Sequence, residues 1–558
     1  MRSNYLRLPL RKALCAGALL LLVWSTPGLG AAWAESPGTA TISAAQMKDY
    51  LTFIASDEME GRATPSRGQN TAAKFISTLL ARWGVKPGGD DGSFFQKIAM
   101  TGKSVIADQS AATLNGQKYV YGEDFLVRVT AGAGAGTASG TLIYAGDGWF
   151  VRSRGIDAYK GLDVRGKIVI VNEGGRGSVP RGVMPADLQG KKGEDWADPA
   201  TYAAMRGAVG ILYIAGERTQ TNWARFRRFS EQSGYSVDRF NDNGGVEVKA
   251  LPALLLNGSL IRALFAGEKI EAPEVLKALQ DGMPLAGFDL KPDKQFAMAA
   301  AVRVSHAMSQ NVVGIVEGSD PALKGEYVGV SAHYDHLGLA PSNGDAQGVY
   351  NGADDDGSGT VGVLAIAEAA SHAESRPKRS LLFVWHMGEE TGLLGSKYFT
   401  MFPTVPLKQV DAFINIDMIG RSKIPGNTNA ANKNLTGPNE IYVIGATVMS
   451  SDLDALCRQV NANYLNLTYN FKYDDPKDPE KIFYRSDHFN YARQGIPILF
   501  YFDGVHEDYH QMSDKVDKID FGKMERVTRT IYQTLWELAS LRERPKVDKP
   551  LPPQLRGQ

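Results

Sequence analysis

Short apolar runs alternate with amphipathic segments throughout the second half of the chain. Runs rich in β-branched and aromatic residues predict strands at 311–316, 327–332, 381–385, 412–416, 441–444 and 498–501. Segments of helical length and spacing predict helices at 360–374, 395–399, 452–464 and 524–541. Strands that alternate with helices predict an α/β fold with a mostly parallel central sheet and helices on both faces.

The first half has a different pattern. Ser43 and Gln46 form a capping-box pattern before apolar residues at helical spacing, and a second amphipathic helix is expected at 69–83. From about residue 126 to 285, short apolar runs are separated by glycine-rich turns. We therefore expect a small β-rich domain at 126–285, inserted into a larger domain.

The larger domain is accordingly expected to be discontinuous, at 35–125 and 286–545. The tail at 546–558 is rich in Pro and Lys and is expected to be loose.

Residues 1–34 have the features of a secretory signal peptide. Four basic residues precede the apolar stretch Ala13–Trp24, and Ala32-Trp33-Ala34 fits a cleavage site. The stretch is well short of the ~20 residues that a membrane span needs, which favours cleavage over an anchor. Cys15 would leave with this leader, and Cys457 would remain without a disulfide partner. We expect a soluble exported protein, periplasmic or secreted.

Composition limits the classes of partner. The formal net charge is zero, with 43% hydrophobic and 22% charged residues, which are globular values. No basic stretch predicts a nucleic-acid-binding face. All eight histidines lie between His306 and His510, so the chemistry is expected in the second half.

The segment 326–360 holds the strongest chemical signal. A buried strand is expected to end at His333, followed by Asp335 two residues later and then by three consecutive aspartates, 354–356. Three adjacent carboxylates repel one another and cannot be buried ionised without a counter-charge. An isolated triplet of this kind would be a solvated loop. Between an apolar strand and an apolar helix, it predicts a site for a divalent metal.

Other candidate ligands follow the ends of the remaining strands, where functional groups gather in such sheets. Glu389 and Glu390 follow 381–385, Asp417 follows 412–416, and His510 follows 498–501. Each could instead be a helix cap or a core residue, but the joint pattern favours zinc, with cobalt or manganese as possible substitutes. His506 to His510 also matches HExxH, but that zinc motif needs a helix, and no helical period runs through it.

Taken together, these motifs resemble the co-catalytic di-zinc exopeptidase family that includes secreted bacterial leucyl aminopeptidases and glutamate carboxypeptidase. The matching pieces are AHYDH at 332–336, NGADDD at 351–356, EETGLLGS at 389–396, NIDM at 415–418, SDH at 486–488 and DYH at 508–510. Residues 126–285, with GLDVRGKIV at 161–169 and GAVG at 207–210, resemble the protease-associated domain often inserted in this family.

The resemblance implies two zinc ions and a division of their ligands. His333 and Asp417 would hold one ion, Glu390 and His510 the other, and Asp355 would bridge both. Asp335 would orient the ligating imidazole of His333.

The resemblance also implies a reaction. Glu389 would act as the general base that activates a metal-bridged hydroxide for attack on a peptide carbonyl. The expected activity is an aminopeptidase acting on peptides. A carboxypeptidase, a glutaminyl cyclase and a non-catalytic binding protein are alternatives on the same scaffold. The inserted domain is expected to be a lid or a wall of the substrate path, and the sequence does not indicate an oligomeric state.

Overall fold

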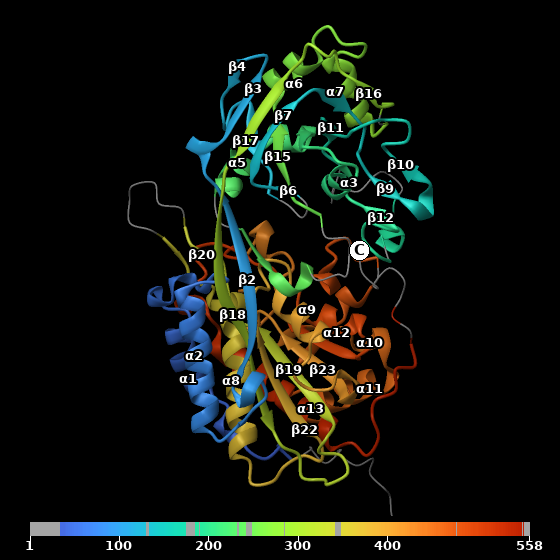
Figure 1. Ribbon diagram of the computed structural model, residues 1–558. Coiled ribbons are helices and arrows are strands. Elements are labelled where there is room, and N and C mark those ends of the chain that lie inside the picture. The colour runs from blue at the N-terminus through green and yellow to red at the C-terminus, as the bar shows by residue number, and fades with distance from the viewer. Residues whose placement is uncertain are drawn as a thin grey trace, which may run out of the picture.

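The chain forms two bodies, one above the other in Figure 1. The computed structural model describes residues 34–551 except 130–132, 175–182, 184, 189, 232–233, 242–247, 284, 341–347, 476 and 550. The predicted signal peptide at 1–34 therefore lies outside the described residues, apart from its last position. None of the helices in the described ranges combines the length and the apolar character needed to cross a membrane.

The lower body is built on a central sheet with the strand order β14-β2-β18-β22-β19-β23-β26-β24-β25. In that order the strands are Gly234–Val237, Phe95–Val105, Val302–Val316, Ser380–His386, Tyr327–His333, Val410–Ile416, Ile498–Phe502, Glu440–Ile444 and Thr468–Asn470. The four strands β22, β19, β23 and β26 run parallel, and antiparallel pairs join them to β18 on one side and β24 on the other. The predicted α/β fold with a mostly parallel centre is confirmed.

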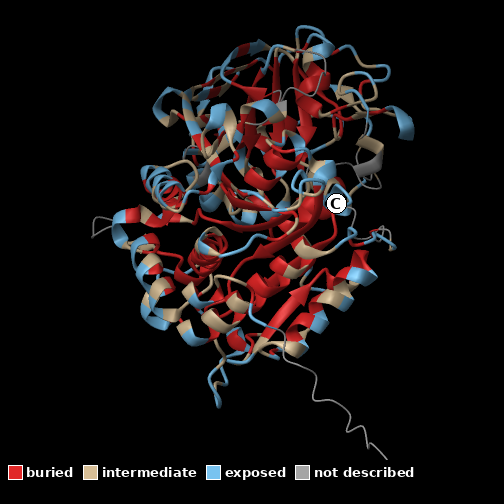
Figure 2. Cartoon of the chain, turned by 90° about the horizontal axis from the view of Figure 1, so that it is seen from below, coloured by how far each residue is buried: buried red, intermediate tan, exposed pale blue. Residues whose placement is uncertain are grey.

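Both faces of this sheet are buried. Successive side chains of a strand point to opposite faces, so each strand contributes to two hydrophobic cores. In β22, Leu381, Phe383 and Trp385 join one hydrophobic core, whereas Leu382 and Val384 join another. Figure 2 shows the buried strands between helices whose outer surfaces are exposed. The first core also contains side chains of α1, α2, α8, α11 and α13, at Ala44–Ile54, Arg67–Arg82, Gly359–His372, Ser451–Asn463 and Phe521–Ser540. The second contains side chains of α9 (Leu394–Met401), α10 (Ala446–Met449) and α12 (His488–Arg493).

The upper body contains two further main sheets. One has the order β16-β8-β11-β13-β15-β5, at Phe288–Asp289, Leu142–Tyr144, Ile168–Asn172, Gly210–Ile214, Leu251–Leu256 and Phe125–Val127. The other has the order β4-β3-β17-β7, at Gln117–Tyr119, Ala111–Leu114, Phe296–Ala300 and Gly136–Gly140. Helices α3, α6 and α7 span Pro199–Met205, Gly258–Phe265 and Ala272–Asp281.

These pairings place the inserted body differently from the expected range 126–285. Strands β3 and β4 precede residue 126 and β17 follows residue 285, yet β17 pairs with both β3 and β7. Conversely, β14 lies inside the expected range but pairs with β2 at the edge of the lower sheet. Because of these antiparallel pairings, the upper body includes β3 and β4 before residue 126 and β17 after residue 285.

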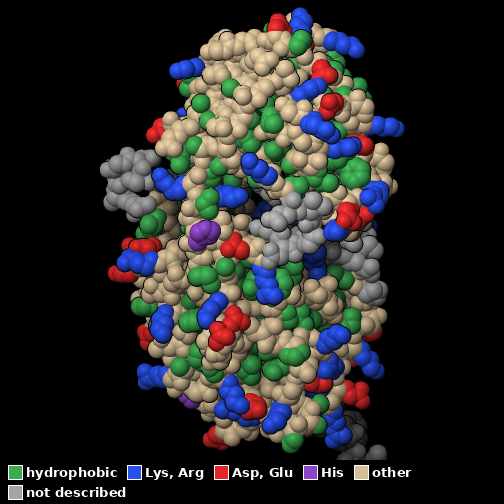
Figure 3. Space-filling view, in the orientation of Figure 1, with side chains coloured by type: hydrophobic (Ala, Val, Ile, Leu, Met, Phe, Trp, Pro, Cys, Tyr) green, Lys and Arg blue, Asp and Glu red, His purple; other side chains and the backbone are tan. Residues whose placement is uncertain are grey.

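The long strands β2 and β18 connect the bodies and pair with each other over their whole shared length. β18 starts directly after β17 of the upper body and runs down into the central sheet, where β22 is antiparallel to it. The C-terminal ends of β22, β19, β23 and β26 consequently point back toward the upper body. In Figure 3 the surface is hollowed between the two bodies, with Lys and Arg side chains at the border of the hollow.

The described part of the tail corrects one expectation. The stretch after residue 545 was expected to be loose, but the backbone N–H of Lys546 donates to the Asp452 carboxylate at 3.0 Å, and Lys549 N–H donates to the Met449 carbonyl at 3.2 Å. Leu551 is buried. The Asp452 side chain of α11 and the backbone carbonyl of Met449 at the end of α10, which the composition of the tail does not reveal, hold it in place.

Two valines test the assignment of the central sheet. Val330 in β19 has no exposed surface, whereas Val304 in β18 is 52% exposed. Val330→Ala should lower the free energy of unfolding by about 2 kcal/mol, because two buried methyl groups are lost and a cavity remains. Val304→Ala should change it by less than about 0.5 kcal/mol. Urea unfolding monitored by circular dichroism measures both, and equal losses would contradict this burial.

Candidate metal centre

The three consecutive aspartates are all buried but point to different partners. The Asp354 carboxylate accepts the Gly420 N–H at 2.7 Å and lies 3.1 Å from His506 Nε2. The Asp356 carboxylate accepts the backbone N–H groups of His333 and Met418, both at 3.1 Å, and of Gly359 at 2.9 Å. These two side chains therefore tie strand ends together and leave Asp355 facing the candidate ligands.

Asp355 contacts imidazoles on two sides. Its Oδ1 lies 3.3 Å from His333 Nε2, and its Oδ2 lies 3.1 Å from His510 Nε2. His333 Nε2 is also 3.7 Å from Asp417 Oδ1, and His510 Nε2 is 3.1 Å from Glu390 Oε2. The structure thus brings together all five predicted ligands, with one carboxylate between two separate pairs.

Four of the five predicted ligands are placed by the end of a strand, and Asp355 lies in the turn before α8. His333 is the last residue of β19, and Asp417 directly follows β23. Glu390 lies in the loop between β22 and α9, and His510 lies in the loop after β26. Because these four strands are parallel neighbours, their ends lie at one edge of the sheet, as expected for this class of fold.

The two predicted catalytic residues lie beside this group. Asp335 Oδ1 accepts the backbone N–H of Glu389 at 3.1 Å and lies 3.7 Å from His333 Nδ1. The closer partner of His333 Nδ1 is the Asp335 carbonyl oxygen, at 3.2 Å. Asp335 therefore supports both the imidazole, mainly through its backbone, and the loop that carries Glu389.

Electrostatics link the titratable groups of the cluster. Burial lowers the pKa of His510, but the neighbouring Asp355 and Glu390 carboxylates outweigh it and raise that pKa to about 10. Burial raises the pKa of Asp355, but the two imidazoles outweigh it and hold that pKa well below its usual value. Burial, with Asp417, Glu390 and Asp487 nearby, raises the pKa of Glu389 well above its usual value. These shifts follow from the close approach of imidazoles and carboxylates within one buried cluster.

The candidate ligand atoms are better arranged to bind a metal than to form hydrogen bonds with one another. His333 Nε2, Asp355 Oδ2 and Glu390 Oε1 are buried and have no hydrogen-bond partner of good geometry among the described atoms. Such orphaned polar atoms are costly in a protein interior. Imidazole nitrogens and carboxylate oxygens are ligands that zinc accepts. His333 with Asp417, and Asp355 with Glu390, also fall in two groups compact enough to hold an ion. The first group also includes Asp356, whose oxygens accept backbone N–H groups. The second also includes His336, and His510 belongs to neither group.

Two residues that the sequence reasoning missed support the cluster. His336 is buried, and its Nδ1 lies 2.7 Å from Glu390 Oε1. The sequence did contain a signal for His336, because this histidine follows His333 by three residues and Asp335 by one. The fully buried Arg62 donates to the carbonyl oxygens of Tyr334 at 3.0 Å and Gly352 at 2.9 Å. Arg62 precedes the helix predicted at 69–83, and its partners are about 270 to 290 residues away.

The HExxH match does not form a metal site. The loop from 503 to 512 contains turns and no helix, so His506 and His510 do not share a helical face. His506 is buried against Asp354, and Arg421 Nη1 lies 3.3 Å from its Nδ1. This agrees with the prediction that only His510 points into the cluster.

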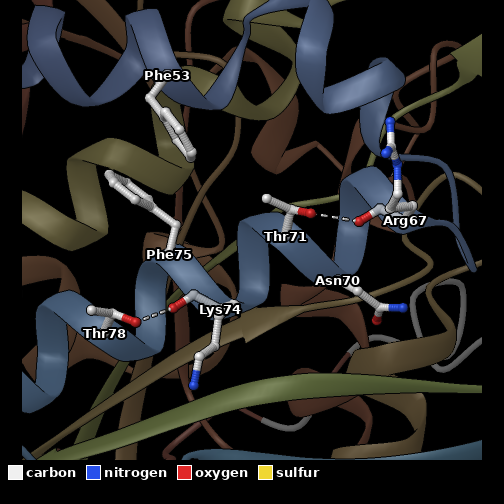
Figure 4. Close-up of a pocket in the computed structure, with 7 residues that line it drawn as sticks. All are labelled: Phe53, Arg67, Asn70, Thr71, Lys74, Phe75 and Thr78. Carbon is white, nitrogen blue, oxygen red and sulfur yellow. Dashed lines mark hydrogen bonds between the residues drawn. The ribbon is translucent and has the colours of Figure 1, made fainter.

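A shallow groove of about 720 Å³ on α1 and α2 is separate from this centre. Figure 4 shows Phe53 of α1 facing Phe75 of α2, with Thr71 and Thr78 bonded to the backbone of α2. Its lining holds no imidazole and no carboxylate. The groove therefore offers none of the chemistry of the metal centre.

Comparison with known proteins agrees with the motifs. Residues 311–535 match the family described as Peptidase family M28. Leucine aminopeptidase 2 of Arthroderma otae is 25% identical over 334 residues, which cover 54% of this chain and 61% of that protein. A probable leucine aminopeptidase of Arthroderma benhamiae is 27% identical over 228 residues, 39% of this chain and 56% of that protein. This match agrees with the resemblance drawn from the motifs. The chain spans about 61% of the length of the first relatives.

A solved structure supports the fold. The aminopeptidase from Aneurinibacillus sp. strain AM-1 superposes with a TM-score of 0.51, covering 92% of this chain and 97% of that one at 16% sequence identity. At this identity the similarity shows a shared fold.

Zinc should stabilise the protein that has been stripped by a chelator. Zinc at a large excess over its dissociation constant should raise the unfolding temperature by roughly 5 °C, because it binds the folded state. The rise should be larger at pH 8 than at pH 6, since protons compete for His510, whose pKa is raised to about 10. Differential scanning fluorimetry measures both effects. An unchanged unfolding temperature at both pH values would contradict a metal site.

Proposed function

We propose that this protein is an exported zinc-dependent aminopeptidase that releases N-terminal residues from peptides. The observation that carries the proposal is the position of Asp355 between two ligand pairs, His333 with Asp417 and Glu390 with His510. A carboxylate with one oxygen toward each pair suits two ions that share a ligand. The names of the M28 relatives support peptide bonds as the target.

The five ligands would hold two zinc ions. When bound, such ions polarise a carbonyl and lower the pKa of water. Glu389 would take the proton of the attacking water and return a proton to the leaving amine. Its raised pKa, caused first by burial, would fall beside bound cations toward the range of a working base. Asp335 would hold Glu389 in place by accepting its backbone N–H.

The inserted body would act as a wall of the path to the centre. The strand ends that carry the ligands point toward this body through the antiparallel pairing of β18 and β22. We therefore propose that it limits the size of peptides that reach the ions.

A digest with blocked peptides tests the activity. Purified protein with zinc should shorten a peptide stepwise from its N-terminus, N-terminal acetylation should prevent this, and C-terminal amidation should leave it unchanged. Mass spectrometry of the products gives the order of loss. Shortening from the C-terminus would assign a carboxypeptidase, and intact peptides throughout would refute a peptidase.

Glu389→Gln tests the proposed base. The amide has nearly the same shape but cannot accept the proton, so kcat should fall by about 10²–10⁴-fold. Metal content, measured by inductively coupled plasma mass spectrometry, should stay at the wild-type value. His333→Ala should instead lose metal, and His306→Ala, which changes an exposed histidine of β18 that contacts the Thr101 hydroxyl, should alter neither quantity. Near-normal turnover of Glu389→Gln would refute the role.

A further inference from the structure

The metal centre opens to solvent on one side. The His510 side chain is 35% exposed, whereas those of His333, Asp355, Glu390 and Asp417 are between 1% and 11% exposed. A peptide therefore approaches the ligands past His510.

An arginine lies at this opening. The Tyr509 ring stacks on His510, with centroids 3.9 Å apart and planes at 21°. The exposed Arg485 donates from Nη2 to the Tyr509 hydroxyl at 3.2 Å, and its Cζ is 5.8 Å from the centroid of that ring. A single aromatic side chain thus separates the guanidinium from the most open ligand.

Arg485 has no carboxylate partner within ion-pair distance among the described residues. Two other arginines of the lower body do, since Arg421 pairs with Asp508 at 2.9 Å and Arg379 with Asp411 at 2.5 Å. The phenol and the ring face hold the position of Arg485 without neutralising it. Three or more of its N–H groups remain available to a bidentate anion.

We propose that Arg485 selects substrates by binding a carboxylate on the part of the peptide that leaves. This rests on the proposed function. The N-terminal amine of the substrate is a cation and is attracted to the carboxylate-rich centre, so the guanidinium at the opening favours the opposite charge farther along the chain. The ring distances of 5.8 Å and 3.9 Å place the guanidinium carbon within about 10 Å of the His510 ring. An extended residue advances the chain by about 3.5 Å, so a group a few residues past the cleaved bond can reach the guanidinium.

Two sources supply such a carboxylate. One is the free C-terminus of a dipeptide or tripeptide, and the other is an Asp or Glu side chain after the cleaved bond. The pairs Leu-Ala against Leu-Ala-amide and Leu-Asp-amide against Leu-Asn-amide separate them, because each pair differs in one negative charge.

The readout is the ratio of kcat/KM within each pair. Wild type should prefer the charged member of at least one pair by about three- to tenfold, as expected for a charge-assisted contact at a partly exposed site. Arg485→Gln should bring that ratio to about one, and Arg485→Lys should keep part of it, since lysine lacks the planar fork. A ratio within one variant is insensitive to the fraction of protein that is folded or loaded with metal.

Arg493→Gln is the matched control. Arg493 is an exposed arginine at the end of α12, and its Cζ lies 5.6 Å from the Phe489 ring. Its loss should leave the ratio unchanged. A ratio of one in the wild type, or a wild-type ratio in Arg485→Gln, overturns the inference while peptide hydrolysis persists. Absence of hydrolysis of all four peptides overturns the proposed function and the inference with it.

Discussion

Burying three consecutive carboxylates is the constraint on which the lower body depends. Ionised groups in a protein interior must find a counter-charge or hydrogen bonds. Asp356 meets this with three backbone N–H groups from three different elements, so one side chain joins the end of β19, the start of α8 and the end of β23. Asp354 uses Gly420 and His506 in the same way. The hydrogen bonds that offset the burial of these carboxylates also hold the strand ends together in a rigid junction.

The same junction explains the position of Asp355. Its backbone N–H donates to Asp514 at 3.1 Å, and its neighbours on both sides are fixed, so its carboxylate has little freedom. Arg62 adds the second support, because it binds the carbonyl of Tyr334 in one loop and that of Gly352 in the other. A metal would therefore enter a site whose geometry is held by hydrogen bonds from elements distant in sequence. Such preorganisation is what a functional metal site requires.

Much of the lower body could be predicted from the sequence because its signals are local. Runs such as Ser380–His386 are apolar on both faces, as expected of a buried parallel strand, and four of the five candidate ligands lie at the end of such a run or in the loop after it. The boundaries of the inserted body could not be predicted, since they depend on β17 pairing with β3 across more than 180 residues. Arg62 was missed for a related reason, because its importance comes from partners that only the folded chain brings near.

The HExxH match illustrates the difference between a motif and a site. The HExxH spacing alone makes His506 and His510 equally good candidates for a metal ligand. The conformation of the local backbone distinguishes them. After β26 the chain turns without forming a helix, so the two imidazoles point in different directions. His506 becomes a partner of Asp354 and His510 a partner of Asp355, that is, of neighbouring residues in one aspartate triplet. One histidine thus stabilises the junction while the other faces the opening beside Tyr509, and this division follows from the buried charges rather than from the motif.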